Sequence, residues 1–401
     1  MKKDIIICLY DMEIGGIERS LINMLENFDY EQFNVDLLIF EHKGDFMKLI
    51  PKQVKILPQI DKYAVFRKPI VQCLREGHII TSSIRILSKY ISNIKAKVSK
   101  LDEGSAYIQM QLAIKFSSHI LPKLKKQYDL AISYAWPHDI VANRITANKK
   151  IAWIHTDYSS LEIDNNIDLK TWLKFDNIAS ISKDCTSAFL KMYPSLKEKI
   201  VLIENITSPE FINRMSKSPG IEQFELKEHD FNLLSVGRYS YVKGFDMAIK
   251  ALKRLHDKGY TNIKWYVIGY GGSESELLQL IKENGLEKSF KLLGKKDNPY
   301  PYIKACDLYV QPSRYEGKSV TVTEAKILRK PILITRYPTA SSQIEHGVEG
   351  FICELSVEGL VKDIEVLYLD TNMRLTLKNN LLKIDLSNAD QLDKLYKIVN
   401  I

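Results

Sequence analysis

The sequence predicts an α/β protein of two domains, each a parallel sheet covered by helices. Short apolar runs alternate with stretches of helical periodicity along the chain, which is typical of repeated strand–helix units. A length of 401 residues exceeds one ordinary core and suits two domains. Residues 204–231 carry two prolines, a glycine and mixed charge between the two series of units, so we expect the linker there.

The first series of units predicts a Rossmann-like domain over residues 1–205. Ile5 to Tyr10 is a continuous apolar run, and apolar residues then recur at helical spacing from Ile17 to Leu25. A long helical pattern covers residues 69–126. Further strands are expected at residues 35–40, 130–134, 150–154 and 178–181.

The second series predicts another Rossmann-like domain over residues 206–385. Each of its apolar runs is followed by a helical stretch, and the runs are residues 233–236, 264–268, 290–293, 307–310 and 331–335. Residues 386–401 predict a final helix, and the sequence leaves open which domain it joins.

Composition indicates a folded protein of a reducing compartment. Apolar residues make up 45% and charged residues 26%, which are ordinary globular values. The five cysteines are scattered without a CxxC spacing, so we expect neither a zinc site nor a disulfide framework. The first apolar run is too short for a signal peptide, and no run is long enough to span a membrane. We therefore expect a cytoplasmic protein.

The formal charge of +8 is concentrated in one segment. Nine Lys or Arg residues and two acids lie between Asp61 and Lys100, interleaved with apolar residues. This pattern predicts an amphipathic basic surface over Lys62–Lys100 that docks on an anionic inner membrane leaflet. A solvated helical face whose apolar stripe packs on its own domain fits the pattern equally well.

Loops after strands are where an open α/β sheet binds ligands. Gly15 and Gly16 follow the first strand directly before a helix, where backbone N–H groups could approach a phosphate or a sugar. A plain glycine turn joining strand to helix is an equally good interpretation.

The loop VGRYSYVKGFD follows the first strand of the second series. Arg238 and Lys243 lie five positions apart in it, so both could converge on one anion near a helix start, and a diphosphate fits that arrangement. Taken alone, a solvated basic pair is the commoner case.

Two further loops are candidates for nucleotide contacts. Gly269 and Gly271 follow the next strand, either as a mere turn or where flat backbone meets a nucleotide, and Lys295 follows the strand after that.

The segment SRYEGKSVTVTEAKILRKPILIT is the most informative. Glu316 lies in a loop, and Glu324 follows eight positions later in a predicted helix whose N-cap is Ser319. The helix start should present free N–H groups from Lys318 to Thr321, Val320 among them, to an anion, while two carboxylates accept hydrogen bonds from vicinal hydroxyls. Carboxylates for sugar hydroxyls and amides for phosphates are what a nucleotide sugar requires.

Together these motifs resemble the retaining GT-B glycosyltransferases of family 4, which build bacterial surface and capsular polysaccharides. The paired glutamates, the Arg/Lys pair and the N-terminal glycine loop carry the resemblance. It implies two Rossmann-like domains facing across a cleft, of which the N-terminal domain binds the acceptor and the C-terminal domain the nucleotide sugar.

The resemblance also implies residue roles. Glu324 holds the donor ribose, Glu316 contacts the donor sugar, and Arg238 with Lys243 neutralises the diphosphate. The segment IAWIHTDY nominates His155 as a histidine that reaches the donor sugar. The remaining donor-binding positions are Gly15, Gly16, Gly269, Gly271, Lys295, Lys318, Ser319 and Val320. The sequence GKSVTVT between the glutamates departs from the aromatic residue and the second glycine or proline that many members carry, which leaves the donor sugar open.

The predicted activity is metal-independent transfer of a hexose or N-acetylhexosamine, from a UDP-sugar or another nucleotide sugar, to a polysaccharide or lipid-linked acceptor. No strand-end loop carries Asp-x-Asp, so we expect no metal and no cofactor. Other GT-B chemistry, such as sugar-nucleotide epimerisation or phosphorolysis, stays open. A dinucleotide-binding enzyme of the Rossmann type would carry GxGxxG after its first strand, and this sequence does not. A non-catalytic nucleic-acid or membrane module would leave the glutamate pair and the Arg/Lys pair unexplained. We expect no nucleic-acid partner.

Overall fold

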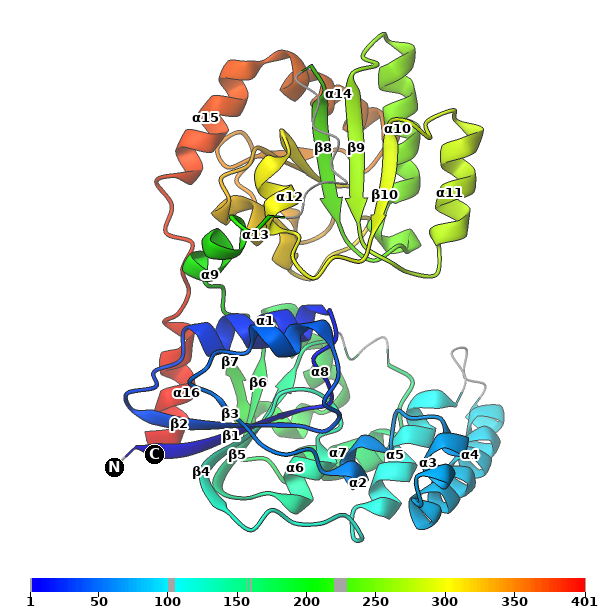
Figure 1. The fold of residues 1–401 in the computed structure, drawn as a ribbon, viewed down its shortest axis with the longest axis vertical. Coiled ribbons are helices and arrows are strands. Elements are labelled where there is room, and N and C mark those ends of the chain that lie inside the picture. The colour runs from blue at the N-terminus through cyan, green and yellow to red at the C-terminus, as the bar shows by residue number, and fades with distance from the viewer. Residues whose placement is uncertain (1, 100–104, 157, 159–160, 220–228, 401) are drawn as a thin grey trace. The chain divides into compact units, whose positions relative to one another are not determined.

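The computed structural model describes residues 2–99, 105–156, 158, 161–219 and 229–400. The chain divides into two compact units (Figure 1). Unit 1 comprises Met1–Thr207 with Asn388–Ile401, and unit 2 comprises Ser208–Ser387. Each unit contains one sheet of parallel strands connected through helices, so the predicted α/β architecture of two Rossmann-like domains is confirmed.

The sheet of unit 1 has seven strands in the order β3-β2-β1-β4-β5-β6-β7. The strands are β1 (Lys3–Leu9), β2 (Phe33–Ile39), β3 (Lys55–Ile56), β4 (Gln127–Ser133), β5 (Thr146–Ile154), β6 (Asn177–Ser180) and β7 (Ile200–Leu202). Consecutive residues from Ile5 to Leu9 are all buried, because helices cover both faces of the sheet.

The helices of unit 1 fall into two groups. Those that connect or flank the strands are α1 (Gly16–Glu26), α6 (Asp139–Arg144), α7 (Asn165–Trp172), α8 (Lys183–Met192) and α16 (Gln391–Asn400). Between β3 and β4 the chain inserts α2 (Asp61–Ala64), α3 (Ile70–Arg75), α4 (Ile79–Ser99) and α5 (Ala106–Ser117). Figure 1 shows α3, α4 and α5 grouped together, and α4 packs on both of the others.

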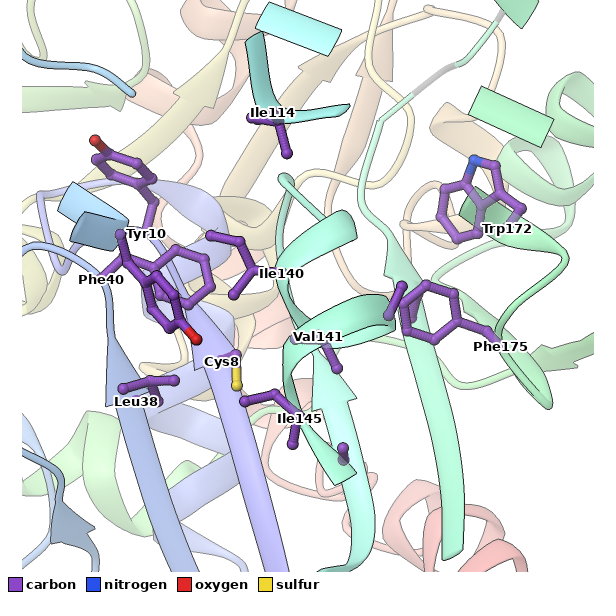
Figure 2. Packing of buried hydrophobic residues seen from close by; sticks show 14 of the residues in the cluster. Cys8, Tyr10, Leu38, Phe40, Ile114, Ile140, Val141, Ile145, Trp172 and Phe175 are labelled. Atoms are coloured by element: carbon purple, nitrogen blue, oxygen red, sulfur yellow. The ribbon is translucent and has the colours of Figure 1, made fainter. Parts of the chain in front are cut away.

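The core of unit 1 is rich in aromatic side chains. The rings of Tyr10 and Phe40, which follow β1 and β2, meet edge to face with centroids 6.2 Å apart. Figure 2 shows Ile140 of α6 and Ile145, which follows this helix, beside residues of these strands, among them Cys8. This packing anchors the strand ends from which the loops of unit 1 emerge.

The final helix, α16, belongs to unit 1 although unit 2 precedes it in the chain. Tyr396 stacks on Phe33 of β2 with ring centroids 4.8 Å apart, and its hydroxyl accepts a hydrogen bond of 2.8 Å from the backbone N–H of Asp29. These contacts settle the position that the sequence left open.

The sheet of unit 2 has six strands in the order β10-β9-β8-β11-β12-β13. The strands are β8 (Phe231–Val236), β9 (Ile263–Ile268), β10 (Phe290–Gly294), β11 (Leu308–Gln311), β12 (Ile332–Thr335) and β13 (Phe351–Cys353). The helices are α9 (Pro209–Met215), α10 (Phe245–Asp257), α11 (Glu274–Glu283), α12 (Tyr300–Ala305), α13 (Val320–Ile327), α14 (Val357–Leu369) and α15 (Thr371–Leu381).

The structure corrects the prediction of an irregular linker over residues 204–231. The described part of that stretch contains α9, whose N-cap Ser208 accepts a hydrogen bond of 3.3 Å from the N–H of Phe211. Pro209 occupies the start of the helix, where a proline is favoured because no N–H partner is needed there. We had interpreted this proline as a break. Residues 220–228 lie outside the described residues.

Candidate active site

The candidate site of unit 2 lies where the strand order reverses. β8 lies between β9 and β11. The chain adds β9 and β10 on one side of β8, and then adds β11, β12 and β13 on the other side. The carboxyl ends of the strands beside such a reversal form the usual ligand-binding crevice of an open α/β sheet. The loops that carry Lys243 and Glu316 both start here.

The loop after β8 is pinned to the loop after β11 by backbone approach. Gly244, between the short turn η4 (Tyr241–Lys243) and α10, has φ of 69°, a left-handed conformation. A Cβ at this position would lie 1.9 Å from the carbonyl oxygen of Pro312. Only glycine fits, and this contact fixes the position of Lys243 next to the second loop.

Lys243 and Glu316 form an ion pair at the centre of the candidate site. Lys243 Nζ lies 2.6 Å from Glu316 Oε1, and the two side chains are 23% and 9% exposed. The same carboxylate oxygen accepts hydrogen bonds from Gln311 Nε2 at 3.0 Å and from Ser313 Oγ at 2.6 Å. Three donors therefore hold the Glu316 side chain in one orientation.

Arg314 is a positioning residue that the sequence analysis missed. Its guanidinium group makes two hydrogen bonds of 2.7 Å to the carboxylate of Asp246 at the start of α10. It also donates a hydrogen bond of 2.6 Å to the carbonyl oxygen of Tyr241, and its Cζ lies 3.9 Å from the centroid of the Tyr241 ring. Arg314 thus ties the loop of Glu316 to the turn that carries Lys243. The only signal in the sequence was its place between a strand end and Glu316.

Arg238 does not share the environment of Lys243. Its side chain is exposed, and it forms no ion pair with any acid among the described residues. We predicted that both cations converge on one anion. In the structure their side chains have different surroundings, because Lys243 pairs with Glu316 while Arg238 is exposed. Arg238 keeps its charge available for a ligand.

Glu324 lies in α13 and has no exposed surface. The hydroxyl of Tyr300 in α12, itself 3% exposed, donates a hydrogen bond of 3.0 Å to Glu324 Oε1. We had expected a carboxylate open to ribose hydroxyls. In the structure, a neighbouring side chain must move before a ribose can reach it.

The start of α13 differs from the prediction in its hydrogen bonds. Ser319 is the N-cap residue, but its hydroxyl makes no capping bond and instead lies 3.1 Å from Thr321 Oγ1. Its backbone N–H donates to Gln343 Oε1 at 3.1 Å, so this amide is not free to meet an anion. Lys318 is exposed and Val320 is half-buried beside it.

The glycines after β9 have a structural reason of their own. Added Cβ atoms at Gly269 and Gly271 would lie 1.9 Å from Gly237 O and 2.4 Å from Tyr239 O. The two strand-end loops therefore touch through their backbones. Lys295, after β10, is exposed, with its Nζ 5.5 Å from the ring centroid of Tyr270.

In unit 1, the glycine loop begins at the corresponding reversal between β1 and β4. A Cβ at Gly15 would lie 2.2 Å from Glu18 Oε2, whereas Gly16 has open space around it. The Glu18 carboxylate thus folds back on the start of α1, the place where the sequence predicts a ligand phosphate or sugar. Burial raises the pKa of Glu18 to about 7, and the nearby Asp11 adds to that rise.

His155 follows β5, and its ring lies 4.7 Å from that of Tyr134, which follows β4. Its Nε2 is buried and has no hydrogen-bond partner within the described part of the chain. Burial lowers the pKa of His155 to about 4, although a hydrogen bond to the backbone of Tyr134 works in the opposite direction. The ring is therefore neutral at pH 7, with one nitrogen available.

Two further features, a metal-binding cluster and a membrane-spanning helix, are absent from the described residues. These residues contain no cluster of three or more His, Cys, Asp or Glu residues placed to hold a metal ion. None of their helices combines the length and the apolar composition that a membrane span needs.

Comparison with known proteins finds a family resemblance in the C-terminal half of the chain. Residues 218–383 match the family model of glycosyl transferases group 1. The chain is 29% identical over 153 residues to an uncharacterized glycosyltransferase of Methanocaldococcus jannaschii, covering 38% of this chain and 37% of that protein.

A second relative comes from Campylobacter jejuni. It is the N-acetylgalactosamine-N,N'-diacetylbacillosaminyl-diphospho-undecaprenol 4-alpha-N-acetylgalactosaminyltransferase, 27% identical over 242 residues. The match covers 60% of this chain and 63% of that protein, so the chain spans less than two thirds of either relative.

Among solved structures, HepE of Anabaena, in complex with UDP and glucose, matches with a TM-score of 0.65 and 18% identity. The superposition covers 98% of this chain and 99% of HepE. At this identity the likeness concerns the fold, and the fold is that of the GT-B glycosyltransferases.

Proposed function

We propose that the protein, whose unit 2 carries the group 1 glycosyl transferase match, is a retaining glycosyltransferase. The proposed reaction moves a hexose or N-acetylhexosamine from a nucleotide diphosphate sugar to a polysaccharide or a lipid-linked oligosaccharide. A UDP-sugar is the expected donor, in line with the UDP bound by HepE, and a lipid-linked acceptor is in line with the name of the Campylobacter relative. The proposed location is the cytoplasm.

The observation that carries this proposal is the Lys243–Glu316 pair at the strand-order reversal of unit 2. It brings a cation for phosphate and a carboxylate for hydroxyl groups to one point, which a nucleotide sugar requires. The exposed Arg238 is on the same loop as Lys243 and adds a second cation. Tight anchoring by Gly244 and Arg314 keeps the pair in place before any ligand binds.

The proposed chemistry relies on the charge that develops during the reaction. When the bond from the sugar to the diphosphate loosens, negative charge grows on the leaving phosphate oxygen. One fixed cation about 4 Å away contributes roughly 4 kcal/mol at an effective dielectric constant near 20, or about three decades of rate. In this proposal Arg238 and Lys243 supply that charge, and Lys243 turns from Glu316 toward the phosphate.

Glu316 is proposed to orient the donor sugar and not to attack it. Its Oε1 already accepts three hydrogen bonds, which lowers its nucleophilicity. The proposal gives Glu324 the donor ribose and His155 a hydroxyl of the donor sugar. Gly15, Gly16, Gly269, Gly271, Lys295, Lys318 and Val320 keep their predicted donor contacts within it, and Ser319 joins them once its amide leaves Gln343 Oε1.

Nucleotide binding tests the proposal directly. The melting temperature of the full chain would be measured with UDP, GDP, ADP and their sugar derivatives. A ligand present at 100 times its Kd adds about 2.7 kcal/mol of stability. We expect a UDP-selective rise that Glu324→Gln reduces and that Glu276→Gln, an exposed glutamate of α11, leaves unchanged. No rise with any nucleotide would contradict the proposal.

Product analysis separates transfer from its rivals. With donor and a lipid-linked or oligosaccharide acceptor present, we expect a new glycosidic product with retained configuration. Turnover of donor alone, to an epimer or to free sugar, would instead identify an epimerase or a hydrolase.

A further inference from the structure

The helix α4 of the insertion in unit 1 has its apolar side turned outward. Its buried side carries small polar residues, with Thr81, Ser82, Ser88 and Ser92 each at most 5% exposed. Its outer side carries large apolar residues, and their exposed fractions are Ile79 64%, Ile80 66%, Ile86 53%, Leu87 53%, Tyr90 68%, Ile94 48% and Val98 79%. This arrangement is the reverse of an ordinary surface helix.

The residues on the inner side of α4 fix the rotation of this helix about its own axis. The hydroxyl groups of Ser82 and Ser88 are buried without a hydrogen-bond partner among the described residues. Small side chains there allow α4 to pack closely on its neighbour α5. Arg85, also on the inner side, donates to the carbonyl oxygen of Val65 and lies 3.3 Å from Cys73 Sγ, which fixes the rotation of the helix.

Some of the charges that the sequence assigned to a docking surface are engaged within unit 1. Arg67 pairs with Asp11 at 3.0 Å, Lys68 with Glu76 at 3.0 Å and Lys95 with Asp164 at 2.5 Å. Docking through the predicted basic surface over Lys62–Lys100 therefore stays a prediction that rests on fewer cations than the sequence suggests, and Lys100 lies outside the described residues.

A smaller set of cations borders the apolar side. Arg75, Lys89 and Lys97 are exposed, and no acid pairs with them within the described ranges. The helix itself contains no Asp or Glu. The outer side of α4 is thus largely apolar, and all of its charged residues are cations. The helix has 21 residues and is about 30 Å long.

We propose that the outer side of α3 and α4 inserts into the interface of an anionic lipid bilayer. Helices that lie in this plane bury their apolar side by about 5 to 10 Å while basic residues meet anionic headgroups. Tyr90 suits the boundary between acyl chains and headgroups. Val71 and Leu74, 61% and 42% exposed on α3, extend the same surface. The proposal concerns attachment alone and does not depend on sugar transfer.

The charges favour a bilayer over a second copy of the chain as the occupant. Two copies joined through this surface would bring Arg75, Lys89 and Lys97 of each toward the same groups of the other, with no acid on α4 to compensate. Like charges oppose that association, whereas an anionic bilayer attracts both copies.

Flotation with vesicles tests the proposal on the full chain without donor or acceptor. Vesicles of phosphatidylcholine with phosphatidylglycerol are compared with phosphatidylcholine alone. The triple variant Leu87→Ser, Tyr90→Ser, Ile94→Ser should lower partitioning about 100-fold, because each half-inserted side chain contributes roughly fivefold. The control replaces three exposed leucines of unit 2, Leu369, Leu375 and Leu382, by serine and should bind as the wild type does.

A charge series examines the second part of the surface. Arg75→Glu, Lys89→Glu and Lys97→Glu together should lower binding to anionic vesicles by at least about 100-fold at low salt. Lys170→Glu, Lys183→Glu and Lys191→Glu, also exposed on unit 1, form the matched control. They should have a much smaller effect.

Tyr90→Trp keeps the surface and reports on its surroundings. Its fluorescence should shift to shorter wavelength with anionic vesicles and be quenched by brominated lipid, while Leu375→Trp should not respond. The proposal is overturned if the chain fails to bind anionic vesicles, or if the apolar triple variant binds unchanged. It is also overturned if α4 instead mediates a dimer that the triple variant dissociates. A missing nucleotide response would overturn only the enzymatic proposal.

Discussion

Lys243 Nζ and Glu316 Oε1 lie 2.6 Å apart across the two loops that open at the strand-order reversal of unit 2. The partners are 73 positions apart in the sequence. Gly244 holds the first loop against Pro312, and Arg314 holds the second against α10. The pair therefore couples the two halves of the candidate site, and several measurable consequences depend on it.

Removing either cation should lower turnover more than donor binding. We expect Arg238→Ala and Lys243→Ala each to reduce kcat by about 100-fold to 1000-fold with a smaller change in KM, because the charge they oppose develops during bond breaking. Steady-state kinetics with the identified donor measure this. Arg254→Ala, an exposed arginine of α10, is the control. Unchanged kcat in a folded variant removes that residue from the mechanism.

Arg314 should act through Lys243. We expect Arg314→Ala to lower kcat about 10-fold to 100-fold, because the turn carrying Lys243 loses its two-pronged anchor to Asp246. The double variant with Lys243→Ala should be no slower than Lys243→Ala alone. Additive losses would show that Arg314 acts independently of Lys243, contrary to this assignment.

Activity should survive an excess of EDTA. The proposed electrophilic groups are the side chains of Arg238 and Lys243, so chelation of divalent ions leaves them intact. Initial rates with and without EDTA, followed by addition of magnesium or manganese, measure this. Loss of activity that either ion restores would contradict the metal-independent mechanism.

Mild acid should destabilise unit 1 through His138. This ring is 4% exposed, lies 2.8 Å from Ser133 Oγ through Nδ1 and packs on Trp172. Burial lowers the pKa of His138 from 6.5 to about 3, with a smaller contribution from His155. Below pH 6.5 the unfolded chain binds a proton that the folded chain does not accept until about pH 3. Stability is therefore lost as the pH falls through this window.

His155, whose pKa burial also lowers, to about 4, adds a loss of similar size over this range, so a His138 variant removes only the part that belongs to His138. Between pH 7 and pH 5 we expect His138 to remove about 2 kcal/mol from the free energy of unfolding. The raised pKa of the buried Asp168, about 6, opposes this loss in every variant. Urea unfolding followed by tryptophan fluorescence should show a weaker pH dependence for His138→Asn than for the wild type. The exposed His42→Asn should match the wild type.

Local patterns in the sequence were enough for the architecture. Runs such as Ile5 to Tyr10 are apolar at consecutive positions because a parallel sheet is covered on both faces, and this is visible without any knowledge of the partners. The same runs located the strand-end loops, and so Gly15, His155, Lys243 and Glu316. The roles of these residues stay predictions until the variants are measured.

Short or atypical elements escaped the sequence analysis. β3, β7 and β13 have two or three residues each, too few to show a period. From the sequence, Pro209 was interpreted as a break in the pattern, but it starts a helix. Whether a proline ends or begins a helix depends on whether the following residues have a capping partner, here Ser208.

The amino-acid order alone thus established two strand–helix series, their loops and the residue types that those loops carry. Pairings between distant positions came only from the folded chain, among them Arg314 with Asp246, Tyr300 with Glu324, and Glu18 turned back on Gly15. The orientation of α4 is of the same kind. Its period shows that an apolar side exists, but which side faces inward depends on the neighbours against which the helix packs, and close packing on α5 selects the serines.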